Sequence, residues 1–296
     1  MSMPITTSVP SPEGSRRSTP GSGSVTEVSS HPCAYNDAAP NLRFVAVISS
    51  DIFVSTSLEV LRAIAEENRE RIDDAAALLH PVIASGGIIH AFGTGHSRAA
   101  AMEMAGRAGG LIPTNQISLA DLVLRGGEGP EALDDPLLER RRDMIPRLLR
   151  LGDVRVGDGF VIISNSGVNA SIVEMASAVA ALGLPIIAVT STAHSTAVPS
   201  RHPSGNRLLD LADVVLDNGA PLGDAILDDE NGTRACGISS MSSALLIQML
   251  TAEIISRITS TGADAPVYVS ANMPGGHERN LGVEAAYAGR LYRIAG

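Results

Sequence analysis

Lysine is absent from the sequence: all 22 basic residues are arginines. Its absence excludes Schiff-base catalysis and the lysine-containing P-loop of many nucleotide-binding proteins. Tryptophan is also absent, and aromatic residues make up only 3% of the chain, so stacking platforms for single-stranded nucleic acid are not expected. A formal net charge of −10 disfavours non-specific binding to nucleic acid or to a membrane surface. We therefore expect neither nucleic acid nor a membrane among the partners of this chain.

Cysteine is scarce as well. The two cysteines, Cys33 and Cys236, are far apart and follow no ligand spacing, which is typical of a reducing cytoplasm and predicts no metal-binding knuckle. No stretch approaches the ~20 apolar residues that span a bilayer, and the N-terminus lacks the basic start and apolar segment of a signal peptide. We expect a cytoplasmic protein that needs neither a metal nor another cofactor.

The chain divides into two regions of different composition. Residues 1–42 are rich in Ser, Pro, Gly and Thr. Such a segment cannot offset the entropy of its own ordering, so we predict a disordered leader. Residues 43–296 are long enough for a single α/β domain. They begin with a segment of helical periodicity over about 50–85 and end with a helical tail, which includes a long helix over 238–262.

Four short apolar runs, each bounded by turn residues, predict buried strands. They span residues 87–92, 160–164, 185–191 and 212–217. An amphipathic helix, NASIVEMASAVAALGL, lies between the second and third runs. Fully apolar strands that alternate with helices indicate an α/β fold with a parallel sheet covered on both faces.

Three of the predicted strand ends are rich in hydroxyls and small side chains. At the carboxyl ends of parallel strands, backbone N–H groups and helix dipoles favour an anion. One such turn alone would be more typical of a helix cap, but three at successive strand ends predict a phosphate cradle. The predicted binding residues are Gly93, Thr94, Gly95, His96 and Ser97 of the first turn, Ser164, Asn165, Ser166, Gly167 and Asn169 of the second, and Thr190 and Ser191 of the third.

Two other phosphate-binding motifs do not match the first turn. A dinucleotide fold would place a glycine where Arg98 stands and an acidic residue ~20 positions further on, where this chain reads IPTNQIS. A P-loop would require a lysine. The predicted ligand is therefore a smaller phosphate.

The motifs FGTGHS, IISNSGVNA and AVTS resemble the sugar isomerase (SIS) domain family, whose members bind phosphosugars; the resemblance covers roughly residues 50–296. The segments GTGHSRAAAMEMAGRAGGL and YVSANMPGG are most similar to a bacterial subgroup described as SIS domain-containing proteins. The resemblance implies a doubly wound, flavodoxin-like sheet of five parallel strands with helices on both faces. It also implies a homodimer or higher homo-oligomer whose subunits share their sites.

The resemblance also implies a role for each turn. The phosphate would lie on the second turn, with Ser164, Ser166 and Asn169 as donors. Ser97 would face it from the first turn, and the third turn would complete the cradle. The family usually has threonine where Asn169 stands, and an amide can donate as well.

One glutamate and two histidines are the candidates for acid–base catalysis. Glu103 lies in the helix that follows the first turn, flanked by Ala and Met, where partial desolvation would suit a catalytic carboxylate. In several SIS enzymes a glutamate of the corresponding helix is catalytic, although its spacing from the turn differs here. The alternative is an ion pair with Arg98 or Arg107. His202, in a loop after the third turn, and His277, in the glycine turn before the last helix, are predicted to reach the site, His277 from either subunit.

Two functions remain open for the domain. The first is an aldose–ketose isomerase, or a related etherase, that acts on a sugar or amino-sugar phosphate by Glu/His acid–base catalysis. The second is a non-catalytic phosphosugar sensor or regulator that acts through protein contacts. The leader is too short and too rich in proline for an added helix-turn-helix domain, so a DNA-binding regulator is disfavoured.

Overall fold

Five parallel strands form the central sheet of the computed structural model, which describes residues 48–135 and 137–293. The strands are β1 (Ile89–Gly93), β2 (Thr114–Ile117), β3 (Gly159–Ile163), β4 (Ile186–Thr190) and β5 (Val214–Asp217), in the order β2-β1-β3-β4-β5. Every pair of neighbours is parallel, which confirms the flavodoxin-like sheet. The predicted leader, residues 1–42, and Cys33 lie outside the described residues.

The order of the strands places a topological switch point between β1 and β3. β1 pairs with β2 on one side and with β3 on the other, so the chain builds the sheet outward in both directions from there. In sheets of this kind, ligands bind at the switch point, outside the carboxyl ends of the strands. β1, β3 and β4 are buried along their whole length, as expected for strands covered on both faces.

β2 is the strand that the apolar pattern does not predict. It reads TNQI and lies at an edge of the sheet. Thr114 and Asn115 are nonetheless buried, because the C-terminal tail covers this edge. The Asn115 amide donates to the carbonyl of Arg290 across 2.7 Å, and its oxygen accepts from the N–H of Tyr292 across 3.0 Å. The tail thus satisfies polar groups that would otherwise be buried without partners.

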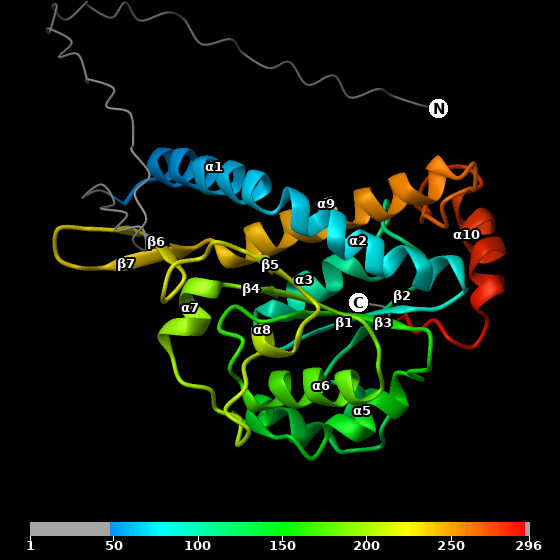
Figure 1. Cartoon of the computed structure of the whole chain (residues 1–296), viewed down its shortest axis with the longest axis horizontal. Coiled ribbons are helices and arrows are strands. Elements are labelled where there is room, and N and C mark those ends of the chain that lie inside the picture. The colour runs from blue at the N-terminus through cyan, green and yellow to red at the C-terminus, as the bar shows by residue number, and fades with distance from the viewer. Residues whose placement is uncertain (1–47, 136, 294–296) are drawn as a thin grey trace, which may run out of the picture. The chain divides into compact units, whose positions relative to one another are not determined.

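Helices cover both faces of the sheet (Figure 1). On one face lie α1 (Ser50–Glu67), α2 (Arg69–Ala84), α3 (Ser97–Met104) and α9 (Ser239–Ser260). On the other face lie α4 (Asp121–Leu124), α5 (Ile145–Leu151), α6 (Ala170–Ala181) and α8 (Leu208–Leu211). Successive strand residues point to opposite faces of the sheet. Ile89 and Val161 pack against the helices of the first face, and Phe160 and Ile162 pack against those of the second.

The remaining elements are short connections. They are α7 (Thr192–Ala197) after β4, the antiparallel strands β6 (Ala225–Asp228) and β7 (Arg234–Gly237) before α9, α10 (Gly276–Glu284) in the tail, and the 3-10 helices η1 (Pro130–Asp134), η2 (Leu138–Arg140) and η3 (Ala285–Tyr287). The apolar pattern does not predict the β6–β7 hairpin, because Ile226 and Leu227 are its only buried apolar residues among those described.

α9 is the long helix predicted over 238–262. Its 22 residues and mean hydropathy would let it cross a membrane by length and composition alone, contrary to the expectation that no segment is long and apolar enough. Its side chains Leu246, Leu250 and Ile254 are fully buried in the same core as α2 and α3. This is the environment of a core helix.

A buried cluster of charges fastens the C-terminal tail to the amino edge of the sheet. Asp158, just before β3, is 1% exposed and accepts hydrogen bonds from Arg290 at 2.8 and 2.9 Å. It also bonds the ring of His90 at 3.1 Å and the backbone N–H groups of Ile88 and Arg155 at 2.9 and 2.8 Å. Burial alone would raise the pKa of Asp158, but these donors outweigh it and lower the pKa to about 2.

Candidate functional site

The first and second turns meet at the switch point of the sheet. Gly93 at the end of β1 is paired with Ile163 at the end of β3, so residues 94–97 and 164–169 leave neighbouring strands at the same edge. Ser97 and Ser166 therefore lie at one edge of the sheet, as a shared phosphate site requires. Each turn leads into the helix that follows it, α3 or α6, and the amino end of each helix adds N–H groups to this edge.

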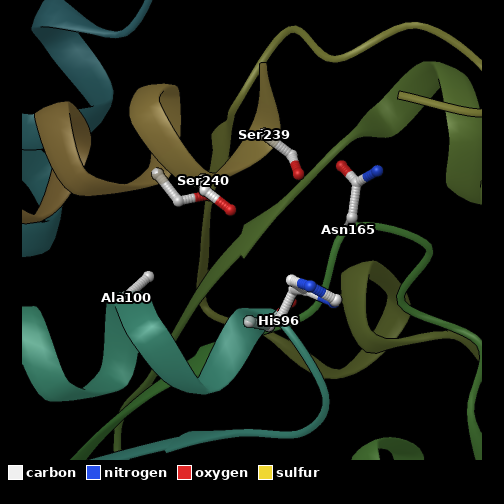
Figure 2. Close-up of a pocket in the computed structure, with 7 residues that line it drawn as sticks. His96, Ala100, Asn165, Ser239 and Ser240 are labelled. Carbon is white, nitrogen blue, oxygen red and sulfur yellow. The ribbon is translucent and has the colours of Figure 1, made fainter. Parts of the chain in front are cut away.

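A small groove lies between these turns and the start of α9 (Figure 2). Its lining consists of His96, Ser97 and Ala100 from the first turn and α3, Asn165 from the second turn, and Ser239, Ser240 and Ser243 from α9. In Figure 2, Ser239 faces Asn165 from the opposite wall. The serines of α9 are not among the predicted residues. The run ISSMSS at the start of a helix was the available signal, but only the packing of α9 on α3 brings it to the turns.

Four side chains at this edge keep their hydrogen-bonding groups free within the part of the chain that the structure describes. They are the hydroxyls of Ser97, Ser166 and Ser240 and the imidazole of His96. Ser240 and His96 are exposed, and Ser97 and Ser166 are half-buried. These groups are available to a ligand without breaking any contact inside the protein.

The second turn also presents its backbone. The N–H groups of Ser166, Val168 and Asn169 donate to no other described residue, whereas the N–H of Gly167 donates to Ser164 Oγ at 3.1 Å. Gly167 has a left-handed φ of +64°, and turns that combine such a residue with right-handed neighbours form anion-binding concavities. Free N–H groups at the start of a helix make this turn suitable for an anion.

Three of the predicted hydroxyls bond inside the protein. Ser164 Oγ accepts from the N–H of Gly167, as just described. Thr190 Oγ1 donates to the carbonyl of Asn165 at 3.3 Å, and Ser191 Oγ donates to the carbonyl of Ala220 at 2.6 Å. Thr190 and Ser191 are fully buried. The structure thus places them behind the groove, where they support the second turn, rather than in the cradle predicted for them.

The other predicted residues of the first turn shape its backbone. A Cβ atom on Gly93 would lie 2.6 Å from the carbonyl oxygen of Ser97, so only glycine allows α3 to start so close to β1. Gly95 has a left-handed φ of +54°, a conformation that favours glycine. The hydroxyl of Thr94 donates to the carboxylate of Glu139 at 3.2 Å. The first turn therefore carries a negative charge beside it.

A chain of hydrogen bonds fixes the side chain of Asn165. The N–H of Ala220 donates to Asn218 Oδ1 at 3.1 Å, which leaves the Asn218 amide to donate to Asn165 Oδ1, also at 3.1 Å. The Asn165 amide then faces His194 Nδ1 at 3.4 Å. In this orientation the amide donates and Nδ1 accepts. His194, which no motif indicated, thus borders the site.

Glu103 lies one turn beyond Ala100 on α3 and contacts α9. Its Oε1 accepts hydrogen bonds from Arg107 and, at 2.7 Å, from the amide of Gln248. The side chain is 24% exposed. The pair with Arg107 is the alternative anticipated from the sequence, but it leaves Oε2 without a donor among the described residues.

His202 is fixed beside α6 and does not line the groove. Its Nε2 lies 2.8 Å from Oε2 of Glu174, and its Nδ1 lies 2.8 Å from Oγ of Ser204. The preceding residue, Arg201, donates to Asn169 Oδ1 at 3.1 Å. This loop therefore packs against the second turn and brings a guanidinium, rather than the imidazole, towards it.

His277 also lies outside the groove. It is exposed near the start of α10, which lies at the opposite end of α9 from Ser239 and Ser240 (Figure 1). Within one chain it does not reach the turns, so its action at the site of a neighbouring subunit stays a prediction. Among the described residues, no three His, Cys, Asp or Glu side chains are grouped to hold a metal ion.

Comparison with known proteins relates this chain to a bacterial family. The family model described as SIS domain matches residues 52–191. A UPF0309 protein of Listeria monocytogenes is 37% identical over 245 residues, which are 82% of this chain and 98% of that protein. A UPF0309 protein of Streptomyces coelicolor is 37% identical over 241 residues, which are 81% of this chain and 95% of that protein.

Solved structures are more distant. The phosphoheptose isomerase of Neisseria gonorrhoeae has 19% sequence identity and a TM-score of 0.47, over 69% of this chain and 95% of that one. The NanR protein of Vibrio vulnificus, solved in complex with ManNAc-6P, has 15% identity and a TM-score of 0.41, over 72% of this chain and 64% of that one.

Proposed function

The chain belongs to the UPF0309 family and carries a SIS domain over residues 52–191, and we propose that the second turn, beside the groove, binds a phosphorylated sugar through the phosphate group. The free N–H groups of Ser166, Val168 and Asn169 carry this proposal. They lie at the amino end of α6, where the helix dipole favours negative charge. The hydroxyl of Ser166 adds a donor in the same turn. Neutral donors of this kind bind a phosphate without a lysine.

Binding is tested by thermal shift and calorimetry with hexose and hexosamine 6-phosphates and with inorganic phosphate. A ligand that binds the native state raises the melting temperature to an extent that grows with its concentration relative to Kd. We expect both inorganic phosphate and at least one sugar phosphate to stabilise the protein, the sugar phosphate more strongly. If neither phosphate class raises the melting temperature at millimolar concentration, the proposed function is wrong.

The reaction we propose for the bound sugar is aldose–ketose isomerisation, or a related etherase reaction, by acid–base catalysis. Two observations support it: the ring of His96 is free in the groove, and Oε2 of Glu103 has no donor among the described residues. The pairing of Oε1 with Arg107 and Gln248 supports the alternative, a non-catalytic sensor, because both partners compete with a substrate for this carboxylate.

The variant Glu103→Gln distinguishes the enzyme from the sensor. A catalyst should lose turnover of its sugar phosphate by at least about 100-fold while keeping its affinity, whereas a sensor should show no turnover before or after the change. Glu253→Gln is the matched control, because Glu253 is also a helical glutamate beside an arginine four residues on, Arg257. Equal turnover by wild type and Glu103→Gln would remove Glu103 from the mechanism.

We also propose that the protein forms a homodimer or higher homo-oligomer whose subunits share their sites. α1 presents Val54 and Leu58, which are 55% and 47% exposed and lie one turn apart. Exposed apolar neighbours of this kind are typical of interaction surfaces. Light scattering after size-exclusion chromatography tests the proposal: a Val54→Asp/Leu58→Asp variant should be monomeric, and a wild-type mass of one chain would contradict it.

A further inference from the structure

Glu139 reaches the first turn from the connection between β2 and β3. It lies in η2, and its Oε2 accepts a hydrogen bond from Thr94 Oγ1 at 3.2 Å. A Cβ atom on Gly95 would be 3.6 Å from the same oxygen, so the carboxylate lies over the backbone of the turn. Ser171 at the start of α6 donates to the carbonyl of Glu139, and the neighbouring Leu138 is buried. The backbone of Glu139 is therefore held at the start of α6, and its carboxylate reaches the first turn.

This carboxylate has no cation of its own among the described residues. Three arginines follow it in sequence, but Arg141 pairs with Asp143 and Arg142 lies near Glu174, and none is paired with Glu139. Glu139 is half-buried, and its single hydrogen bond leaves most of its acceptor sites open. A half-buried charge with so few partners is costly unless a ligand supplies the missing donors.

The charge of Glu139 decides which end of a ligand the first turn receives. A phosphate dianion beside an unpaired carboxylate is repelled, so the phosphate belongs on the second turn, where the N–H groups of Ser166, Val168 and Asn169 are free. The part of the ligand that meets Glu139 must carry donors, and a positively charged donor gains most from an unpaired anion.

On the basis of the proposed function, we infer that Glu139 determines specificity by binding the ammonium group of an amino-sugar phosphate. The ligand places its phosphate on the second turn and its amino group at Glu139, against the first turn. Nothing in the phosphate-binding groups requires an amino sugar. The preference arises from Glu139 alone.

Matched pairs of ligands test this inference. Calorimetry compares each hexosamine 6-phosphate with its parent hexose 6-phosphate in the glucose, mannose and galactose series. In at least one series the amino sugar should bind about tenfold or more tightly, and N-acetylation, which removes the charge, should abolish the gain. Equal affinity within every pair would overturn the inference.

The variant Glu139→Gln identifies the residue responsible. Glutamine keeps an oxygen that accepts from Thr94, so the first turn retains its contact. We expect the preference for the amino sugar to disappear while the affinity for inorganic phosphate changes less than about twofold. Glu131→Gln is the control, because Glu131 is exposed in the same connection. A preference that survives in Glu139→Gln overturns the inference, as does a gain in phosphate affinity of about tenfold, which would place the phosphate in the first turn.

These outcomes are separate from failure of the proposed function. If the wild type binds neither inorganic phosphate nor any sugar phosphate, both ideas fail. If it binds sugar phosphates without regard to the amino group, phosphosugar binding stands and the assignment of Glu139 is wrong.

Discussion

The amide of Asn218 donates a hydrogen bond to the side-chain oxygen of Asn165 across 3.1 Å. This contact links the residue that follows β5 to the second turn. Asn218 is 1% exposed and also accepts from the N–H of Ala220, so its amide cannot rotate without leaving buried groups unpaired. The orientation of Asn165 in the groove is therefore decided by a residue that does not line it.

Replacing Asn218 tests this coupling. Asn218→Ala leaves the Ala220 N–H and Asn165 Oδ1 without partners, which should lower the free energy of unfolding by about 1–3 kcal/mol. It should also weaken phosphate binding, because Asn165 is no longer held. Urea unfolding and calorimetry measure the two effects. Asn231→Ala, in the exposed β6–β7 connection, is the control and should change neither quantity. If Asn218→Ala has the stability and phosphate affinity of the wild type, the contact neither stabilises the fold nor orients Asn165.

The serines of the second turn should separate binding from stability. The Ser166 hydroxyl has no partner among the described residues, so Ser166→Ala should weaken phosphate affinity about tenfold and leave the melting temperature of the free protein unchanged. Ser164→Ala removes the acceptor of the Gly167 N–H and should destabilise the free protein by about 1 kcal/mol. Thermal melts with and without phosphate measure both. The opposite pattern would mean that the roles of the two hydroxyls are reversed.

Gly167 should tolerate no side chain. Its φ is +64°, and an added Cβ would lie 3.1 Å from Ser195 Oγ and Thr190 Oγ1. We expect Gly167→Ala to cost about 2–3 kcal/mol of unfolding free energy, from backbone strain together with crowding. Gly232→Ala is the control, because its φ is +80° but no atom lies within 4 Å of the added Cβ; strain alone should cost about 1 kcal/mol. Equal costs would show that the turn yields to the new side chain.

The buried carboxylate of Asp158 should make stability depend on pH at the acid end. Its pKa is lowered to about 2 in the folded chain, against about 3.9 when unfolded. A lowered pKa contributes stability above the unfolded value, and this contribution is lost as the pH falls towards 2. We expect a contribution of about 2.6 kcal/mol at neutral pH that disappears between about pH 5 and pH 1.

Comparison with Asp158→Asn isolates this contribution from that of the other carboxylates. The variant removes the carboxylate from buried His90 and from Arg290, which is 14% exposed and keeps Asp153 at 3.9 Å, so at pH 7 it should be about 3 kcal/mol less stable than the wild type. The difference should shrink as the pH falls, because the wild-type carboxylate then becomes protonated. Urea unfolding at several pH values measures it, and a difference that does not vary with pH would contradict the assignment.

The core of the fold was predictable because it depends on local patterns. The apolar runs at 87–92, 160–164, 185–191 and 212–217 correspond to β1, β3, β4 and β5. No apolar run predicts β2. This strand carries Thr114 and Asn115, and the C-terminal tail forms hydrogen bonds with the side chain of Asn115. A strand of this kind cannot be recognised from its own residues, since its partners lie far away in the sequence.

The sequence predicts which turns form the site, but it does not predict which of their side chains remain free for a ligand. A glycine-rich or serine-rich turn after a buried strand is visible in the sequence, and the structure brings the first and second turns to one edge. Thr190 and Ser191 look as available as Ser166 in the sequence, yet both are buried and bonded inside the protein. Whether a hydroxyl is free depends on what packs against it.

By itself, the sequence determined that this chain builds a parallel sheet whose first two hydroxyl-rich turns lie at the carboxyl ends of its strands, because periodicity and composition act over neighbouring residues. Only the tertiary structure decided which donors remain free, that Ser239 and Ser240 join the groove, and that Glu139 lies against Thr94. These features arise from contacts between segments far apart in the chain, whose partners no local pattern specifies.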